Sequence, residues 1–157
     1  MQGLRYRLIR LMLEAIAGLG LDRALGPFAR RRGVVLTFHH VRPDALASLP
    51  ENAGLSITPD FLEQVILLLR RLNYDIVTLG DVPTRLAGEG GRPFAALTFD
   101  DGYRDNADFA LPILRRHNAP MTLFVCPGFA ERMAPLWWLD LEEAVMRLDR
   151  FAIDLPD

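Results

Sequence analysis

The sequence contains no lysine, only one cysteine and three histidines. All 18 of its basic residues are arginines, which excludes Schiff-base chemistry and the phosphate-binding lysine of a P-loop. A single cysteine, Cys126, excludes an internal disulfide, so the fold does not depend on an oxidising compartment. We expect Cys126 to be a small buried residue at a strand end. The formal net charge of −2 argues against nucleic acid as a partner.

The 157 residues have an ordinary globular composition and fit one domain preceded by a helical segment. Residues 1–33 carry seven arginines, two acidic residues and apolar positions at helical spacing, which predicts an amphipathic helical segment. Its apolar run is too short to cross a bilayer and no secretory cleavage pattern follows it. Packing against the domain is the favoured interpretation. Peripheral contact with anionic lipid stays open, and the expected location is the cytoplasm or a membrane surface.

Residues 34–157 alternate short apolar runs with helical patterns, which predicts an α/β fold with a parallel sheet or barrel. Thr58 is the expected N-cap of one helix, and Asn73 suits its C-terminal end. The strands are expected at residues 34–38, 75–79, 94–99 and 121–126, and the longer helices at 58–73, 106–117 and 135–148.

Polar pairs follow two of these strands. The stretch "LTFHH" ends in His39 and His40, and "LTFDD" ends in Asp100 and Asp101. The carboxyl ends of parallel strands meet at one rim, where sites are built. We therefore expect His39 to lie beside the two aspartates around a common hollow.

Two adjacent aspartates can divide the tasks of a hydrolase, since one can bind a metal ion while the other accepts a proton. The alternative is that Asp-Asp-Gly forms only a strand-to-helix turn. The paired histidines on a second strand favour the functional interpretation, more strongly for His39 than for His40. Asp105 or Asn106 is expected to cap the next helix, and His117 is expected to be structural.

The stretches "ALTFDDGYRDN" and "LPILRRHNAPMTLFV" resemble the polysaccharide deacetylase family, also called the NodB homology domain or carbohydrate esterase family four. The flanking "LTFHHVRPD" and "LWWLDLEEAV" are similar to a bacterial branch of that family. The resemblance covers residues 34–148. It implies a distorted (β/α) barrel and a metal-dependent hydrolase that removes acetyl groups from N-acetylated sugars of a poly- or oligosaccharide, such as chitooligosaccharides.

Carried over by motif, the resemblance makes Asp100 the general base, Asp101 a ligand of a divalent ion, commonly zinc, and His39 the general acid. The family completes its metal site with a His-x-x-x-His motif, which this sequence lacks. We therefore expect two further histidine ligands beyond Asp157. The sequence is predicted to be the N-terminal part of a deacetylase, with an incomplete barrel and little or no activity alone.

Two other functions are weighed against this one. The first is a non-catalytic carbohydrate-binding remnant that uses the same rim and stacks sugars on Trp137 or Trp138, although ordinary packing of the tryptophans is favoured. The second is phosphoryl transfer, which is disfavoured because no glycine-rich loop follows a strand. The exact glycan and the oligomeric state stay open.

Overall fold

A computed structural model describes residues 8–9, 11–12, 14–16, 18–19, 32–43, 50–88, 91–148 and 150, in two compact units, Met1–Arg32 and Gly33–Asp157. In the first unit, residues 8–9, 11–12, 14–16 and 18 are helical, while the amphipathic segment expected at residues 1–33 stays a prediction because most of it lies outside the described residues. Its apolar side chains Leu8, Ile9, Leu11 and Met12 are exposed. Among the residues described, no helix has the length and apolar character that a membrane span requires.

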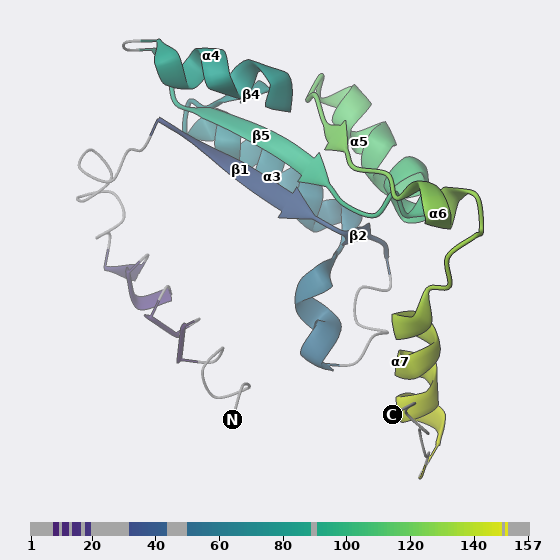
Figure 1. Cartoon of the computed structure of the whole chain (residues 1–157). Helices are drawn as coiled ribbons and strands as arrows, with labels where there is room; N and C mark the ends of the chain where they lie inside the picture. The colour runs from purple at the N-terminus through teal and green to yellow at the C-terminus, as the bar shows by residue number, and fades with distance from the viewer. Residues whose placement is uncertain are drawn as a thin grey trace. The chain divides into compact units, whose positions relative to one another are not determined.

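The second unit is built on a parallel sheet (Figure 1). Its strands are β1 (Gly33–Phe38), β4 (Asp75–Val77), β5 (Phe94–Phe99) and β6 (Thr122–Leu123). The central strand β5 pairs with β1 along its whole length, with β4 at its start and with β6 at its end. The predicted parallel α/β sheet is confirmed, whereas closure into a barrel stays a prediction.

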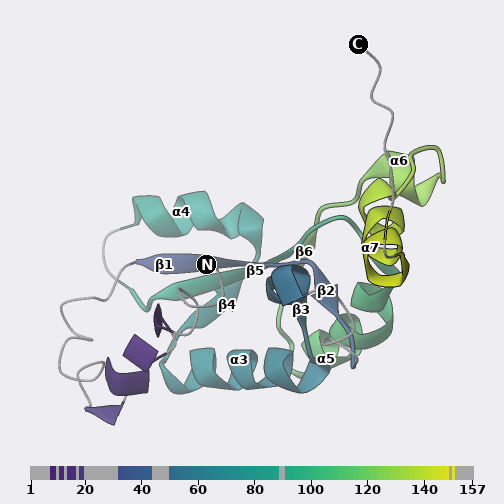
Figure 2. The same cartoon turned by 90° about the horizontal axis from the view of Figure 1, so that it is seen from below.

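Helices cover both faces of this sheet (Figure 2). The helices α3 (Pro59–Arg71) and α5 (Leu111–Arg116) lie on one face, and α4 (Val82–Ala87) lies on the other. Thr58 caps α3 as predicted, because its hydroxyl accepts from the Phe61 N–H at 3.2 Å. Asn73 follows this helix with φ +63°, a conformation that asparagine tolerates better than most residues.

Shorter elements complete the second unit. A small parallel pair is formed by β2 (His40–Val41) and β3 (Ser56–Ile57). The remaining helical elements are η1 (Pro50–Leu55), η2 (Leu79–Asp81), α6 (Pro127–Ala130) and α7 (Trp137–Arg147). The last of these agrees with the helix predicted at residues 135–148.

The core lies between β5 and the helices α3 and α5. Alternate residues of β5 enter it, and its large members include Leu62, Ile66, Leu97, Phe99 and Leu114. Because side chains alternate along a strand, Thr98 and the following Asp100 belong to the other face of the sheet. The apolar packing on one face therefore fixes the direction of the polar residues at the strand end.

The helix predicted at residues 106–117 is interrupted. It consists of a π-helical turn η3 (Asn106–Ala110) followed by α5. Pro112 has no N–H to donate, and the Leu111 N–H reaches back five residues to the carbonyl of Asn106. The wider turn places Asn106 in a buried position close to the end of β1.

Candidate active site at the carboxyl ends of β1 and β5

The two Leu-Thr-Phe segments lie side by side in register, with Thr37 opposite Thr98. Their hydroxyl oxygens are 3.1 Å apart, and the Asp100 N–H donates to the Phe38 carbonyl at 2.9 Å. Beyond this point the His39 Nε2 lies 3.9 Å from the Asp100 Oδ2. Both side chains are about one-third exposed, at 33% and 34%. The structure thus brings together the predicted imidazole and carboxylate where solutes can reach them.

The side chain of Asp101 lies in a different place from that of Asp100, because the chain turns at Asp101. Asp101 has φ +67° and Gly102 has φ +70°, so two consecutive residues adopt the left-handed conformation. Asp101 lines a pocket of about 460 Å³ together with His39 and His40, whereas Asp100 is not among the lining residues. The two adjacent carboxylates therefore lie in different environments, since Asp101 lines the pocket and Asp100 does not.

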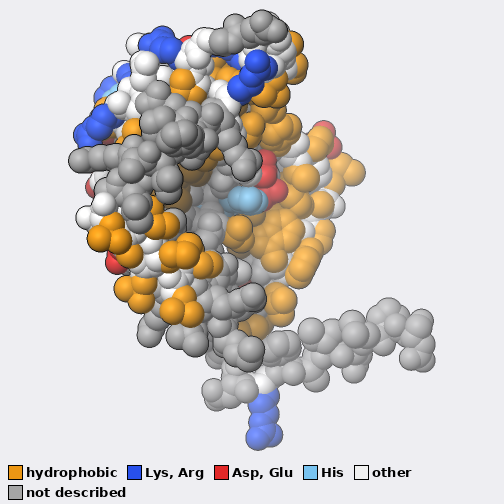
Figure 3. Space-filling view, turned by 90° about the vertical axis from the view of Figure 1, so that its left-hand side faces the viewer, with side chains coloured by type: hydrophobic (Ala, Val, Ile, Leu, Met, Phe, Trp, Pro, Cys, Tyr) orange, Lys and Arg blue, Asp and Glu red, His pale blue; other side chains and the backbone are white. Residues whose placement is uncertain are grey.

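The pocket lies between the strand ends and α7. Its wall includes Tyr103 from the turn after β5, Trp138 from α7 and Arg42 from the segment after β2. On the face drawn in Figure 3, a histidine and acidic side chains are exposed together beside a broad hydrophobic area. The wall of the pocket is largely apolar with a few polar groups, which is typical of a small-molecule site.

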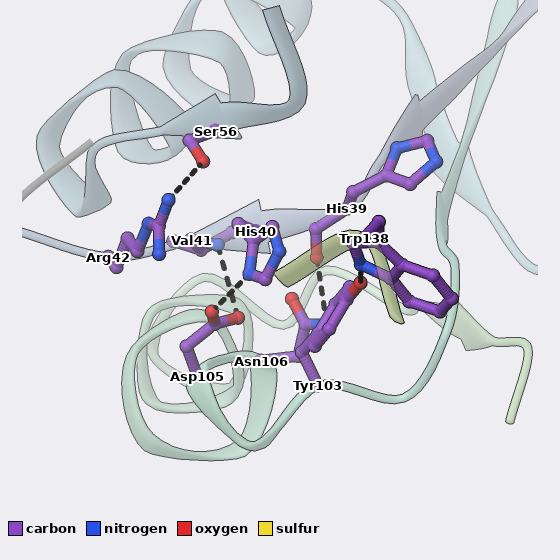
Figure 4. Close-up of polar contacts among 9 residues, drawn as sticks. All are labelled: His39, His40, Val41, Arg42, Ser56, Tyr103, Asp105, Asn106 and Trp138. Carbon is purple, nitrogen blue, oxygen red and sulfur yellow. Dashed lines mark hydrogen bonds and ion pairs between the residues drawn. The ribbon is translucent and has the colours of Figure 1, made fainter. Parts of the chain in front are cut away.

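Side chains that follow β5 hold the segment that follows β1 (Figure 4). The His40 Nδ1 donates to the Asp105 Oδ2 at 2.6 Å, and the Val41 N–H donates to the Asp105 Oδ1 at 3.3 Å. The buried Asn106 donates through Nδ2 to the His39 carbonyl at 3.0 Å. The prediction that Asp105 or Asn106 caps the next helix is wrong, because neither side chain makes a capping bond there. Both instead position the histidine pair.

Tyr103 joins this network from the turn itself. Its ring stacks on the His40 imidazole with the centroids 3.8 Å apart, and its hydroxyl accepts from the Trp138 Nε1 at 3.2 Å. Burial raises the pKa of the Tyr103 phenol, and the nearby Asp101 charge acts in the same direction, while the Trp138 hydrogen bond opposes them. Tyr103 is therefore a neutral phenol at physiological pH.

Three sequence expectations meet different outcomes here. Cys126 is exposed and lines the pocket, contrary to the expected burial, because the sixth strand ends at Leu123. Trp138 packs edge-on against Phe129 on the pocket wall, whereas Trp137 is 62% exposed. His117 lies away from the rim and donates to Glu63 at 2.6 Å, as a structural residue would.

The residues that the structure describes do not form a complete metal site. No group of three His, Cys, Asp or Glu side chains among them could hold a metal ion. A catalytic zinc ion normally takes three protein ligands. The role of Asp101 as a metal ligand therefore stays a prediction.

Part of the chain matches a known protein family. A family model described as polysaccharide deacetylase matches residues 87–150. The structure of IcaB from Ammonifex degensii is 28% identical with a TM-score of 0.51, over 61% of this chain and 39% of that one. Residues 87–150 thus match the polysaccharide deacetylase family. None of the curated proteins matches this chain.

Two further solved structures are similar to this chain. Streptococcus pyogenes deacetylase PplD, in complex with acetate, is 23% identical with a TM-score of 0.51, over 71% of this chain and 51% of that one. A de-N-acetylase from Aggregatibacter actinomycetemcomitans is 24% identical with a TM-score of 0.47, over 59% and 37%. This chain thus spans between 37% and 51% of the length of the three matched structures.

Proposed function

We propose that this chain carries the base and acid of an amide hydrolase that removes acetyl groups from an N-acetylated glycan, with chitooligosaccharide as the expected substrate type. The approach of the His39 Nε2 to the Asp100 Oδ2, 3.9 Å at the accessible rim, is the observation that supports it. An amide needs both a proton acceptor for the attacking water and a proton donor for the leaving amine. A carboxylate and an imidazole at adjacent strand ends offer that pair.

In this proposal Asp100 accepts the proton of the attacking water and His39 protonates the departing amine. Thr37 and Thr98 pair beneath them, so the two strand ends stay in fixed register. Asn106 fixes the backbone at His39 through its 3.0 Å hydrogen bond. General acid–base catalysis of this kind contributes roughly 10²–10⁴-fold to a rate.

Asp101 is proposed as one ligand of a divalent cation, with zinc as the expected ion. Such an ion supplies a Lewis acid when bound. Since the described residues offer no group of three ligands, we assign no step of the reaction to the ion. We propose for the same reason that the chain by itself turns over slowly.

A non-catalytic carbohydrate-binding role is the second candidate. The pocket of about 460 Å³ with Tyr103 and Trp138 on its wall favours it, because aromatic side chains offer apolar faces to sugar rings. The two candidates differ in one respect. Both require that N-acetylated oligosaccharides bind, but only the first requires that acetate is released.

The test measures binding and acetate release from N-acetylated chitooligosaccharides, with and without a chelator. We expect binding by the wild-type chain and by Asp100→Asn, and slow, chelator-sensitive acetate release by the wild-type chain but not by Asp100→Asn. Asp108→Asn, an exposed carboxylate after β5 that pairs with Arg104, is the matched control and should behave as wild type. Binding without release would favour the binding role. Equal release by Asp100→Asn would refute the assigned base.

A further inference from the structure

Arg42 lines the same pocket as His39 and Asp101, and the assigned chemistry does not use it. It follows β2, and its backbone N–H donates to the Ile57 carbonyl at 3.0 Å, which fixes the start of its side chain. Among the described residues that line the pocket, it is the only arginine. Figure 4 shows its guanidinium directed toward Ser56 of β3.

Among the described residues, the Arg42 guanidinium has few hydrogen-bond partners. The Arg42 Nη2 donates to the Ser56 Oγ at 3.1 Å, which is a neutral acceptor. The Arg42 Nε is buried and has no hydrogen-bond acceptor among the described residues. None of the ion pairs formed among the described residues includes Arg42. A buried donor without an acceptor is costly, and more so on a charged group.

Two other arginines near the sheet form ion pairs with a carboxylate. Arg85 and Arg92 both pair with Asp75, at 2.9 Å and 2.5 Å, at the opposite end of the strands. Of the described residues, Arg42 alone brings an arginine charge to the pocket, whose wall also includes Asp101 and Glu142. A planar guanidinium suits a carboxylate or phosphate group, which can accept two of its donors at once.

We infer that Arg42 is a specificity-determining residue that recognises an anionic group, a carboxylate or a phosphate, on the glycan in this pocket. The inference rests on the proposed function, since it names the class of N-acetylated sugar that the same site prefers. The anion supplies the acceptor that the guanidinium lacks, while the rest of the sugar lies along the pocket toward His39. Neutral chitooligosaccharide would then be the weaker ligand.

The test uses the whole 157-residue chain and matched pairs of ligands, with binding measured by calorimetry. The disaccharide of N-acetylglucosamine and N-acetylmuramic acid is compared with N,N′-diacetylchitobiose, which carries the same two acetyl groups but lacks the lactyl carboxylate. N-Acetylglucosamine 6-phosphate is compared with N-acetylglucosamine, so that the two pairs separate a carboxylate from a phosphate. We expect at least one anionic member to bind about tenfold more tightly, which is the scale of one charge-assisted contact.

Variants identify the residue responsible. Arg42→Gln should abolish the preference, and Arg42→Lys should retain only part of it because an ammonium lacks the planar fork. Ser56→Ala removes the neutral partner and should keep the preference, which provides a readout if Arg42→Gln does not fold. Arg71→Gln, on the exposed end of α3, is the control and should change nothing.

Equal binding of the anionic and neutral members by the wild-type chain would overturn the inference, as would a preference that survives in Arg42→Gln or binding of none of the four ligands. Equal binding would leave the proposed deacetylation intact. A further ligand, the disaccharide of N-acetylglucosamine and muramic acid without its N-acetyl group, separates the two proposals. If this disaccharide bound as tightly as the disaccharide that contains N-acetylmuramic acid, the result would count against the proposed function and leave the role of Arg42 standing.

Discussion

The strands β1 and β5 carry the same Leu-Thr-Phe segment in register, yet they differ sharply in burial. All six residues of β5 are buried, whereas β1 has only exposed or half-buried residues. The cause is position, because β5 has paired neighbours on both sides and β1 is paired only with β5 among the described strands. The burial of a strand residue thus depends on its place in the sheet and cannot be read from the local sequence alone.

The ends of the two strands differ in a second way. After β5 the chain turns through two left-handed residues, which separates the carboxylates of Asp100 and Asp101. After β1 the chain continues into β2, and its two histidines are held by Asp105 and Asn106 from the turn beyond β5. The segment that follows the central strand therefore supplies both Asp100 and the two side chains that hold the histidine pair.

The largest expected effect compares Phe99 with Phe38, which occupy equivalent positions in the two strands. Phe99→Ala should lower the free energy of unfolding by about 3–5 kcal/mol, since it leaves a cavity beside Leu62 and Ile66 in the core. Phe38→Ala should cost roughly 1–2 kcal/mol because Phe38 is only partly buried. Urea denaturation measures both. Equal losses would show that the two strands are equally covered in solution.

The second prediction removes the link between the strand ends. Asn106→Ala should lower the free energy of unfolding by about 1–3 kcal/mol, because it deletes a buried donor and leaves the His39 carbonyl without its partner. Asp108→Ala lies in the same turn and loses only an exposed ion pair with Arg104, so it should cost under about 1 kcal/mol. A loss no greater for Asn106→Ala than for Asp108→Ala would remove Asn106 from the positioning role.

The third prediction concerns the turn that distinguishes the end of β5. Gly102→Ala should cost about 1–2 kcal/mol, since φ is +70° and the added Cβ would lie 3.3 Å from the Val125 Cγ1. Gly80→Ala is the control, because its Cβ would meet only the Thr78 Oγ1 at 3.7 Å. Thermal unfolding of both variants gives the comparison. If Gly102→Ala were neutral, the turn would tolerate an ordinary backbone conformation.

The sequence predicts those features that depend on local pattern and strand direction. The parallel strands, the Thr58 cap and the meeting of His39 with Asp100 all follow from alternation and from the shared rim of parallel strands. The roles of Asp105 and Asn106 did not follow, because local preference favours helix caps, whereas their partners lie 64 to 67 residues earlier in the chain. Exposure of Cys126 was missed for a related reason, since nothing local to the sequence shows that β6 ends at Leu123.

The smallest expected effect concerns the helices that cover β5. The hydrogen bond from His117 lowers the pKa of the Glu63 carboxyl, and the charge of Arg116 adds to it while desolvation opposes both. The pKa of Glu63 is lower in the folded state than its ordinary value of 4.5. Ionised Glu63 therefore stabilises the fold at a pH above 4.5, and this stabilisation is lost as the pH falls through the folded-state pKa.

Glu63→Gln should therefore flatten the acid limb of the stability profile below about pH 5, with little change in its shape at neutral pH. Urea midpoints measured between roughly pH 6 and pH 3 provide the profile. Glu131→Gln, an exposed carboxyl in the turn after α6, is the control and should keep the slope of the wild type. An unchanged slope in Glu63→Gln would mean that the contact between α3 and α5 is maintained by apolar packing alone, so that the cover of β5 would not respond to acid through this pair.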